Sequence, residues 1–176
     1  IIWEMGLEMT NVINALSLLA GIPREVIELE PLDMASLVAS AEQRLVHLLD
    51  EYDAKITRPE RWPAAVGYGP WIGEVWINFL RSAIRFGESP VVVEVGATDQ
   101  ADGTIRFWVR RTGTDVETGE DLREELTWMG QVGPRSHGLG NTIVRRIMER
   151  LGGDAGIRSQ EDGTTTYYFT LPKLED

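Results

Sequence analysis

The segment PVVVEVGATDQADGTIRFWVRR, residues 90–111, constrains the fold of this 176-residue chain more than any other. Two runs rich in β-forming residues flank a polar turn at Gln100–Gly103, which is the pattern of an antiparallel hairpin. A second hairpin pattern, GGDAGIRSQEDGTTTYYFTLP, lies near the end of the chain and turns at Asp162–Gly163. Together the two hairpins predict a largely antiparallel sheet.

Helical segments alternate with these hairpins. Asp33 is a plausible N-cap for a helix over about 34–51, Pro70 opens a helix over about 71–86, and residues 138–151 form another. Short extended pieces are expected around 26–29, at 54–59 and at 61–70. This order predicts an α+β fold: a two-layer α/β sandwich with a mixed, mostly antiparallel sheet and three helices on one face.

The segment 112–137 contains four glycines and has only weak periodicity. It predicts a long, mobile loop with at most one helical stretch. Loops of this length in compact domains are usually functional or disordered.

The first 20 residues predict a helix with one narrow apolar stripe. Its members are spaced alternately by three and four residues, which is the seam of a coiled coil. They are Ile2, Met5, Met9, Val12, Leu16 and Leu19. The pattern favours a helix of a bundle or a dimer, most simply one that packs against a second copy, and the alternative is an ordinary core helix.

Charge and composition exclude several functions. The net charge of −11 argues against nucleic-acid binding, which needs clustered basic surface. The absence of cysteine excludes disulfides and thiolate metal sites. No apolar run approaches the ~20 residues of a membrane span. The opening IIWEMGLEM lacks the features of a signal peptide, and we expect the chain to be a piece of something longer.

Two further segments identify a family resemblance. GEVWINFLRSAIRFG (73–87) and HGLGNTIVRRIMERLGG (137–153) stand in order around the first hairpin. This arrangement resembles the C-terminal catalytic, ATP-binding domain of sensor histidine kinases, which has the Bergerat-type fold of gyrase-like ATPases. Residues 31–172 resemble the histidine kinase-like ATP-binding domain, and residues 1–22 resemble the second helix of the dimerisation and phosphoacceptor hairpin.

The resemblance implies roles for four residues of the long helix. Asn78 matches an asparagine that faces the phosphates, and Ser82 replaces the asparagine that holds Mg²⁺, so this pair is the implied metal site. Arg85 replaces a phosphate-binding lysine, and Phe86 replaces a tyrosine near the base. A serine hydroxyl offers Mg²⁺ a weaker, misplaced oxygen. The alternatives are a helix-surface amide for Asn78 and a core aromatic for Phe86.

The first glycine motif of the family is altered. Arg111 stands where the family has an aspartate that accepts a hydrogen bond from the adenine amino group, and a guanidinium can only donate. Gly113 is retained, although a lone glycine after a strand is most often a turn. Asp115 replaces the second glycine and adds a negative charge.

The second glycine motif is better preserved. The resemblance implies that backbone N–H groups of Gly138 and Gly140 cradle phosphate at a helix N-terminus, with Leu139 and Thr142 in the same turn. His137 could donate to phosphate, or it is simply a loop residue. Asn141 replaces the usual leucine, and Leu126 and Trp128 are the stand-ins for the motif that anchors the lid.

The implied function is transfer of the ATP γ-phosphate to a histidine outside this chain, because neither His47 nor His137 lies in a phosphoacceptor motif. No catalytic residue is therefore assigned here. The resemblance also implies ATP and Mg²⁺ as cofactors, a homodimer through the N-terminal helix, a response regulator receiver domain as partner, a cytoplasmic location, and no nucleic-acid or membrane contact.

The altered motifs predict impaired nucleotide binding. One alternative is a pseudokinase that relays a signal or dimerises without binding ATP. Another is a different ATPase of the same fold. Chemistry of the P-loop type is excluded, because no G-x-x-x-x-G-K-[ST] motif occurs.

Overall fold

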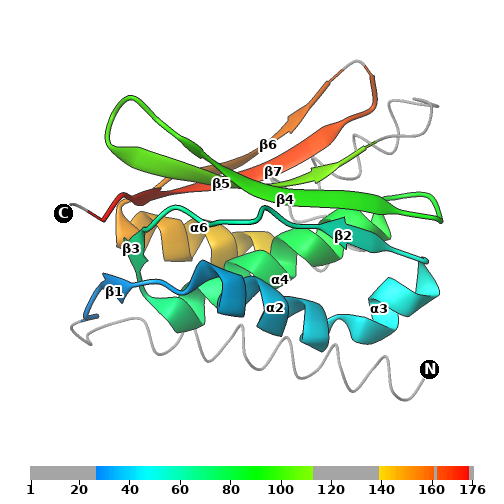
Figure 1. The fold of residues 1–176 in the computed structure, drawn as a ribbon, viewed down its shortest axis with the longest axis horizontal. Helices are drawn as coiled ribbons and strands as arrows, with labels where there is room; N and C mark the ends of the chain where they lie inside the picture. The colour runs from blue at the N-terminus through cyan, green and yellow to red at the C-terminus, as the bar shows by residue number, and fades with distance from the viewer. Residues whose placement is uncertain (1–26, 113–138, 161, 175–176) are drawn as a thin grey trace.

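A computed structural model of the protein describes residues 27–112, 139–160 and 162–174 (Figure 1). The predicted N-terminal helix over 1–22 lies outside these residues, as does nearly all of the predicted loop over 112–137. The elements are β1 (Glu30–Pro31), α2 (Met34–Arg44), α3 (Val46–Glu51), β2 (Lys55–Thr57), β3 (Val66–Gly67), α4 (Gly69–Arg85), β4 (Val92–Asp99), β5 (Thr104–Arg111), α6 (Leu139–Leu151), β6 (Ala155–Ser159) and β7 (Thr165–Pro172).

The main sheet has five strands in the order β2-β4-β5-β7-β6. The β2–β4 pair is parallel, and the other three pairs are antiparallel. The helices lie against one face of this sheet, and the other face carries no helix in the part of the chain that is described (Figure 1). A small antiparallel pair, β1–β3, lies at one side. The predicted α+β sandwich is therefore confirmed.

Both predicted hairpins are confirmed, and their turns share the sequence Asp-Gly-Thr. In the β4–β5 turn the Asp102 carboxylate accepts a hydrogen bond from the Thr104 backbone N–H at 3.0 Å, and Gly103 has φ +80°. The β6–β7 turn repeats this arrangement, since Asp162 accepts from the Thr164 N–H at 2.9 Å. Glycine is suited to the positive φ that such tight turns require.

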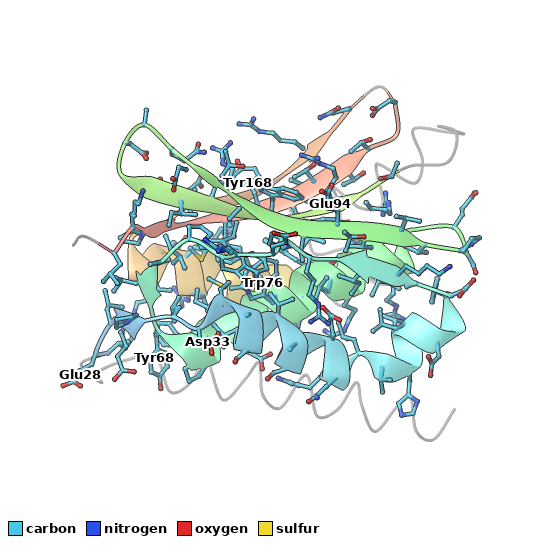
Figure 2. All side chains as sticks on the ribbon, viewed as in Figure 1. Glu28, Asp33, Tyr68, Trp76, Glu94 and Tyr168 are labelled. Carbon is cyan, nitrogen blue, oxygen red and sulfur yellow. The ribbon has the colours of Figure 1, made fainter. Side chains whose placement is uncertain are left out.

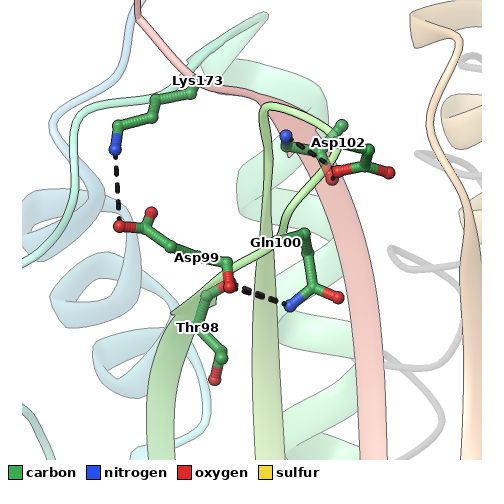
Figure 3. Close-up of polar contacts among 6 residues, drawn as sticks. Thr98, Asp99, Gln100, Asp102 and Lys173 are labelled. Carbon is green, nitrogen blue, oxygen red and sulfur yellow. Dashed lines mark hydrogen bonds and ion pairs between the residues drawn. The ribbon is translucent and has the colours of Figure 1, made fainter.

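A contact between distant segments joins the first turn to the end of the chain. The Lys173 ammonium lies 3.4 Å from the Asp99 carboxylate, as Figure 3 shows. Both side chains are at least half exposed, so the pair adds little stability.

The helices begin where their capping residues predict, with small differences. The Asp33 carboxylate accepts from the Ser36 N–H at 3.1 Å and caps α2. The helix predicted over 34–51 is two helices, because the backbone turns at Leu45. The extended piece predicted around 26–29 is displaced, since β1 begins at Glu30.

The core lies between the sheet and α4. Trp76 is fully buried there, as Figure 2 shows, and its ring centroid is 5.3 Å from that of Phe169 on β7. The Trp76 indole N–H donates to the Met34 sulfur of α2 at 3.0 Å. Through these two contacts Trp76 joins α4 to both α2 and β7. Among the described residues, no helix has the length and apolar character needed to cross a membrane.

Candidate functional site

Two polar residues are buried on α4, one helical turn apart. Asn78 is 4% exposed and Ser82 is 1% exposed. The Asn78 side-chain amide donates to the Glu74 carbonyl oxygen at 2.8 Å, and the Ser82 hydroxyl donates to the Asn78 carbonyl at 2.8 Å. Such bonds to the preceding turn satisfy buried polar groups without a partner from elsewhere. Asn78 is therefore not the surface amide of the alternative interpretation.

The end of α4 presents the other two helix residues of the predicted site. Arg85 is the last residue of the helix and is exposed. Phe86 follows it, is partly buried, and its backbone N–H donates to the Ser82 carbonyl at 3.1 Å. Phe86 is not among the described residues of the hydrophobic core.

Arg111 is the last residue of β5 and is partly buried. Its Nη2 donates a hydrogen bond to the hydroxyl of Thr165 at 3.1 Å, and the two residues are directly paired across β5 and β7. Thr165 is only 3% exposed. A charged donor therefore stands at the end of β5.

The structure brings together the elements that carry these residues. Helix α4 packs against both β5 and α6. In Figure 1 the ends of α4 and β5 lie on the same side of the molecule. Leu139, Gly140 and Thr142 belong to the first turns of α6, whereas Gly113, Asp115, His137 and Gly138 lie outside the described residues.

A protein-family model for the histidine kinase-, DNA gyrase B- and HSP90-like ATPases matches residues 67–175, which is more than half of the chain. The chain belongs to this family. The matched range begins just before α4 and includes both hairpins and α6.

Two curated members of the family are similar over nearly the whole chain. The methanogenesis regulatory histidine kinase FilI of Methanothrix harundinacea is 28% identical, over 96% of this chain and 19% of its own length. An uncharacterised sensor-like histidine kinase of Rhizobium meliloti is 26% identical, over 98% of this chain and 34% of its own. The chain thus spans about a fifth to a third of the length of these two relatives.

The fold is shared with a solved histidine kinase. The crystal structure of full-length ShkA in complex with AMPPNP has a TM-score of 0.75 and 22% sequence identity. The match covers 98% of this chain and 37% of that protein. This agreement confirms the histidine kinase-like ATPase fold.

Arg111, Asn78 and Ser82 are described positions that the resemblance assigns to the nucleotide and its metal. The Arg111 guanidinium offers only hydrogen-bond donors. No cluster of three His, Cys, Asp or Glu side chains suited to a metal ion occurs among the described residues. The Glu74 carboxylate, close to Asn78 in the helix, is already paired with Arg44 at 2.7 Å.

Thr165 and Glu74 are the residues of this region that sequence reasoning missed. Thr165 lies within the second hairpin pattern, but its pairing with Arg111 depends on the register of two strands that are 54 residues apart. Glu74 lies four residues before Asn78, which is the helical spacing of neighbours on one face. This spacing could have predicted from the sequence that Glu74 lies next to Asn78.

Proposed function

We propose that this chain is the nucleotide-binding part of a two-component sensor histidine kinase and that it binds Mg·ATP weakly. In this proposal the γ-phosphate is transferred to a histidine outside these 176 residues. Membership of the ATPase family supports nucleotide binding. The hydrogen bond from Arg111 to Thr165 is the observation that carries the proposed weakness.

The adenine end of the site is the first to be affected. If a nucleotide bound with its adenine amino group towards Arg111, that amino group and the guanidinium would face each other. Both are hydrogen-bond donors, and no acceptor would lie between them. An unpaired donor in a shielded pocket costs about 1–3 kcal/mol. Sites built on such a bond discriminate strongly, so its loss removes selectivity as well as affinity.

The phosphate end is affected through the metal. Ser82 replaces an amide, and its hydroxyl already donates to the backbone of its own helix. Magnesium prefers oxygen ligands at near-ideal octahedral positions, and a short side chain directed along the helix supplies one poorly. Arg85 remains exposed at the helix end and can provide a positive charge to phosphate.

We also propose that the chain consists of two structural parts. Residues 1–22 form half of a dimerisation hairpin, and residues 31–172 form the ATPase domain. The proposed assembly is a homodimer that meets a response regulator receiver domain in the cytoplasm. The spacing of the apolar stripe between Ile2 and Leu19 supports the dimer.

A pseudokinase that relays signals without ATP is the second candidate. The altered residues Ser82, Arg111 and Asp115 all stand at positions of nucleotide chemistry, while the core around Trp76 is fully packed. A domain that is kept for its fold but not for catalysis would accumulate substitutions at its nucleotide-binding positions and keep its core.

Isothermal titration of the full chain with Mg·ATP, Mg·GTP and metal-free ATP tests both candidates. The weak-kinase proposal expects millimolar binding of Mg·ATP with less than about threefold preference over Mg·GTP. Tight and adenine-selective binding would overturn the proposed weakness. A complete absence of binding at millimolar ATP would establish the pseudokinase instead.

A further inference from the structure

The sheet face opposite the helices carries arginines and aromatic rings. Side chains alternate between the two faces of a strand, and burial on β5 and β7 alternates accordingly. Figure 2 shows Tyr168 and Glu94 on the bare side of the sheet. We name five side chains of this side the outer arginine face: Arg106, Trp108 and Arg110 on β5, Arg158 on β6 and Tyr168 on β7.

The two rings of this face lie close to glycines of the neighbouring strands. A Cβ at Gly96 would be 2.4 Å from Cζ2 of Trp108, and one at Gly156 would be 2.7 Å from the Tyr168 hydroxyl oxygen. The Trp108 indole N–H also donates to the Thr98 hydroxyl at 3.2 Å. The two glycines therefore allow both rings to lie close to the sheet.

The arginines in turn lie over these rings. The Arg106 and Arg158 guanidinium carbons are 4.7 and 5.4 Å from the centroid of Tyr168, and that of Arg110 is 4.4 Å from Trp108. Stacking of this kind holds a guanidinium in a fixed orientation while its N–H edge stays available. The face is thus a preorganised set of donors.

These donors are largely without anionic partners. Arg110 is 3.5 Å from Glu94, but both side chains are more than 40% exposed and the pair is weak. Within the described residues, Arg106 and Arg158 form no ion pair. The Arg106 Nε is buried and has no hydrogen-bond acceptor, which is costly for a donor.

We propose that the outer arginine face docks an acidic peptide segment of a partner protein. Carboxylates accept paired hydrogen bonds from planar guanidinium groups, which matches the donors displayed here. A single-stranded nucleic acid is disfavoured, because its bases would need ring surfaces that the guanidiniums already cover. The net charge of −11 also opposes a long polyanion, whereas a short acidic segment needs only this local patch.

Fluorescence anisotropy with the full chain tests the proposal. The probes are a labelled decapeptide of alternating Glu and Ser and its matched Gln–Ser peptide. We expect binding of the Glu peptide only, weakening as salt is raised. Arg106→Gln with Arg158→Gln should weaken it at least about tenfold. The matched pair Arg145→Gln with Arg146→Gln, two exposed arginines of α6, should change it less than about twofold.

Two further variants separate geometry from charge and from misfolding. Arg106→Lys with Arg158→Lys keeps the charge but loses the planar fork, and should still weaken binding about threefold. If the double glutamine variant unfolds, the exposed Arg158→Gln alone takes its place. Equal binding of both peptides, equal loss in the two glutamine pairs, or displacement of the Glu peptide by a tighter-binding oligothymidylate would each overturn the proposal.

Discussion

The indole ring of Trp108 lies over Gly96 so closely that a Cβ at residue 96 would be 2.4 Å from its Cζ2 atom. The two residues are paired across β4 and β5. We predict that Gly96→Ala destabilises the protein by about 1–3 kcal/mol, because the ring must move from its place on the sheet. Urea denaturation measures this change. In a Trp108→Ala background the same substitution should cost less than half as much.

A glycine in α4 serves as a control, because its substitution by alanine is expected to raise stability rather than lower it. Among the described residues, a Cβ at Gly73 would meet Leu37 Cδ2 alone, at an ordinary 3.9 Å. Gly73→Ala is predicted to stabilise the protein by about 0.5–1 kcal/mol, because alanine loses less backbone entropy in a helix. A destabilising Gly73→Ala would show that the helix backbone or its packing differs from the one described.

Repair of the nucleotide site is predicted to restore affinity. Arg111→Asp with Ser82→Asn and Asp115→Gly should tighten Mg·ATP binding at least about tenfold, since one restored hydrogen bond is worth about 1–3 kcal/mol. Titration calorimetry measures the gain. The control combines Arg110→Asp with the same Ser82→Asn and Asp115→Gly, so its net charge equals that of the repaired variant. Its new carboxylate faces the other side of the sheet, and its gain should be clearly smaller. An equal gain in both variants would show that a carboxylate at residue 111 is not what restores affinity.

The bond between Trp76 and Met34 is predicted to contribute to stability. Met34→Leu keeps the volume but removes the sulfur acceptor, leaving a buried indole N–H unpaired at a cost of about 1–3 kcal/mol. Met148→Leu is the matched change at a buried methionine that accepts no described hydrogen bond, and should cost less than about 1.5 kcal/mol. Thermal unfolding followed by circular dichroism compares the two. Equal losses would mean that the sulfur acts only as packing.

Three exposed aspartates are predicted to make the protein sensitive to acid. Bonds from the Ser36 side chain and backbone lower the pKa of Asp33, and bonds from the Thr104 side chain and backbone lower that of Asp102. Bonds from the Thr164 backbone and side chain lower the pKa of Asp162. Because these folded-state pKa values lie below the ordinary 3.8, the stability gained is complete above that pH and lost as pH falls through the lowered values.

Denaturation between pH 5 and pH 2.5 tests this dependence. The Asn variant at all three positions keeps a side-chain acceptor without a titrating charge, so its stability should fall less steeply with acid than that of the parent. Asp50→Asn, which removes a carboxylate with no described side-chain hydrogen bond, is the control. Parallel curves for the parent and the triple variant would contradict the assignment.

The N-terminal stripe is predicted to hold two copies together. Met9→Glu with Leu16→Glu places charges at two seam positions and should convert a dimer to a monomer, because a buried unpaired carboxylate is costly. Light scattering measures the mass. Asn14→Glu, between the seam positions, should leave the dimer intact. A monomeric parent chain would refute the predicted assembly.

Local chemistry made much of the fold predictable. Both hairpin turns have the sequence Asp-Gly-Thr, and the Asp33 side chain caps the helix that follows it. Short sequence windows were therefore enough to predict the turns and the start of α2. The break at Leu45 was not predictable in this way, because no glycine or proline marks it. The Arg111–Thr165 bond and the Arg106–Tyr168 stack depend on strand register, which joins segments more than 50 residues apart.

The two outermost strands of the main sheet are short: β2 has three residues and β6 has five. An edge strand exposes unpaired backbone groups that can template the addition of another chain, and a short edge offers little length for it. Lys55 on β2 and Arg158 on β6 add like charges that repel a second edge of the same kind. Both features protect the sheet from edge-to-edge aggregation at high concentration.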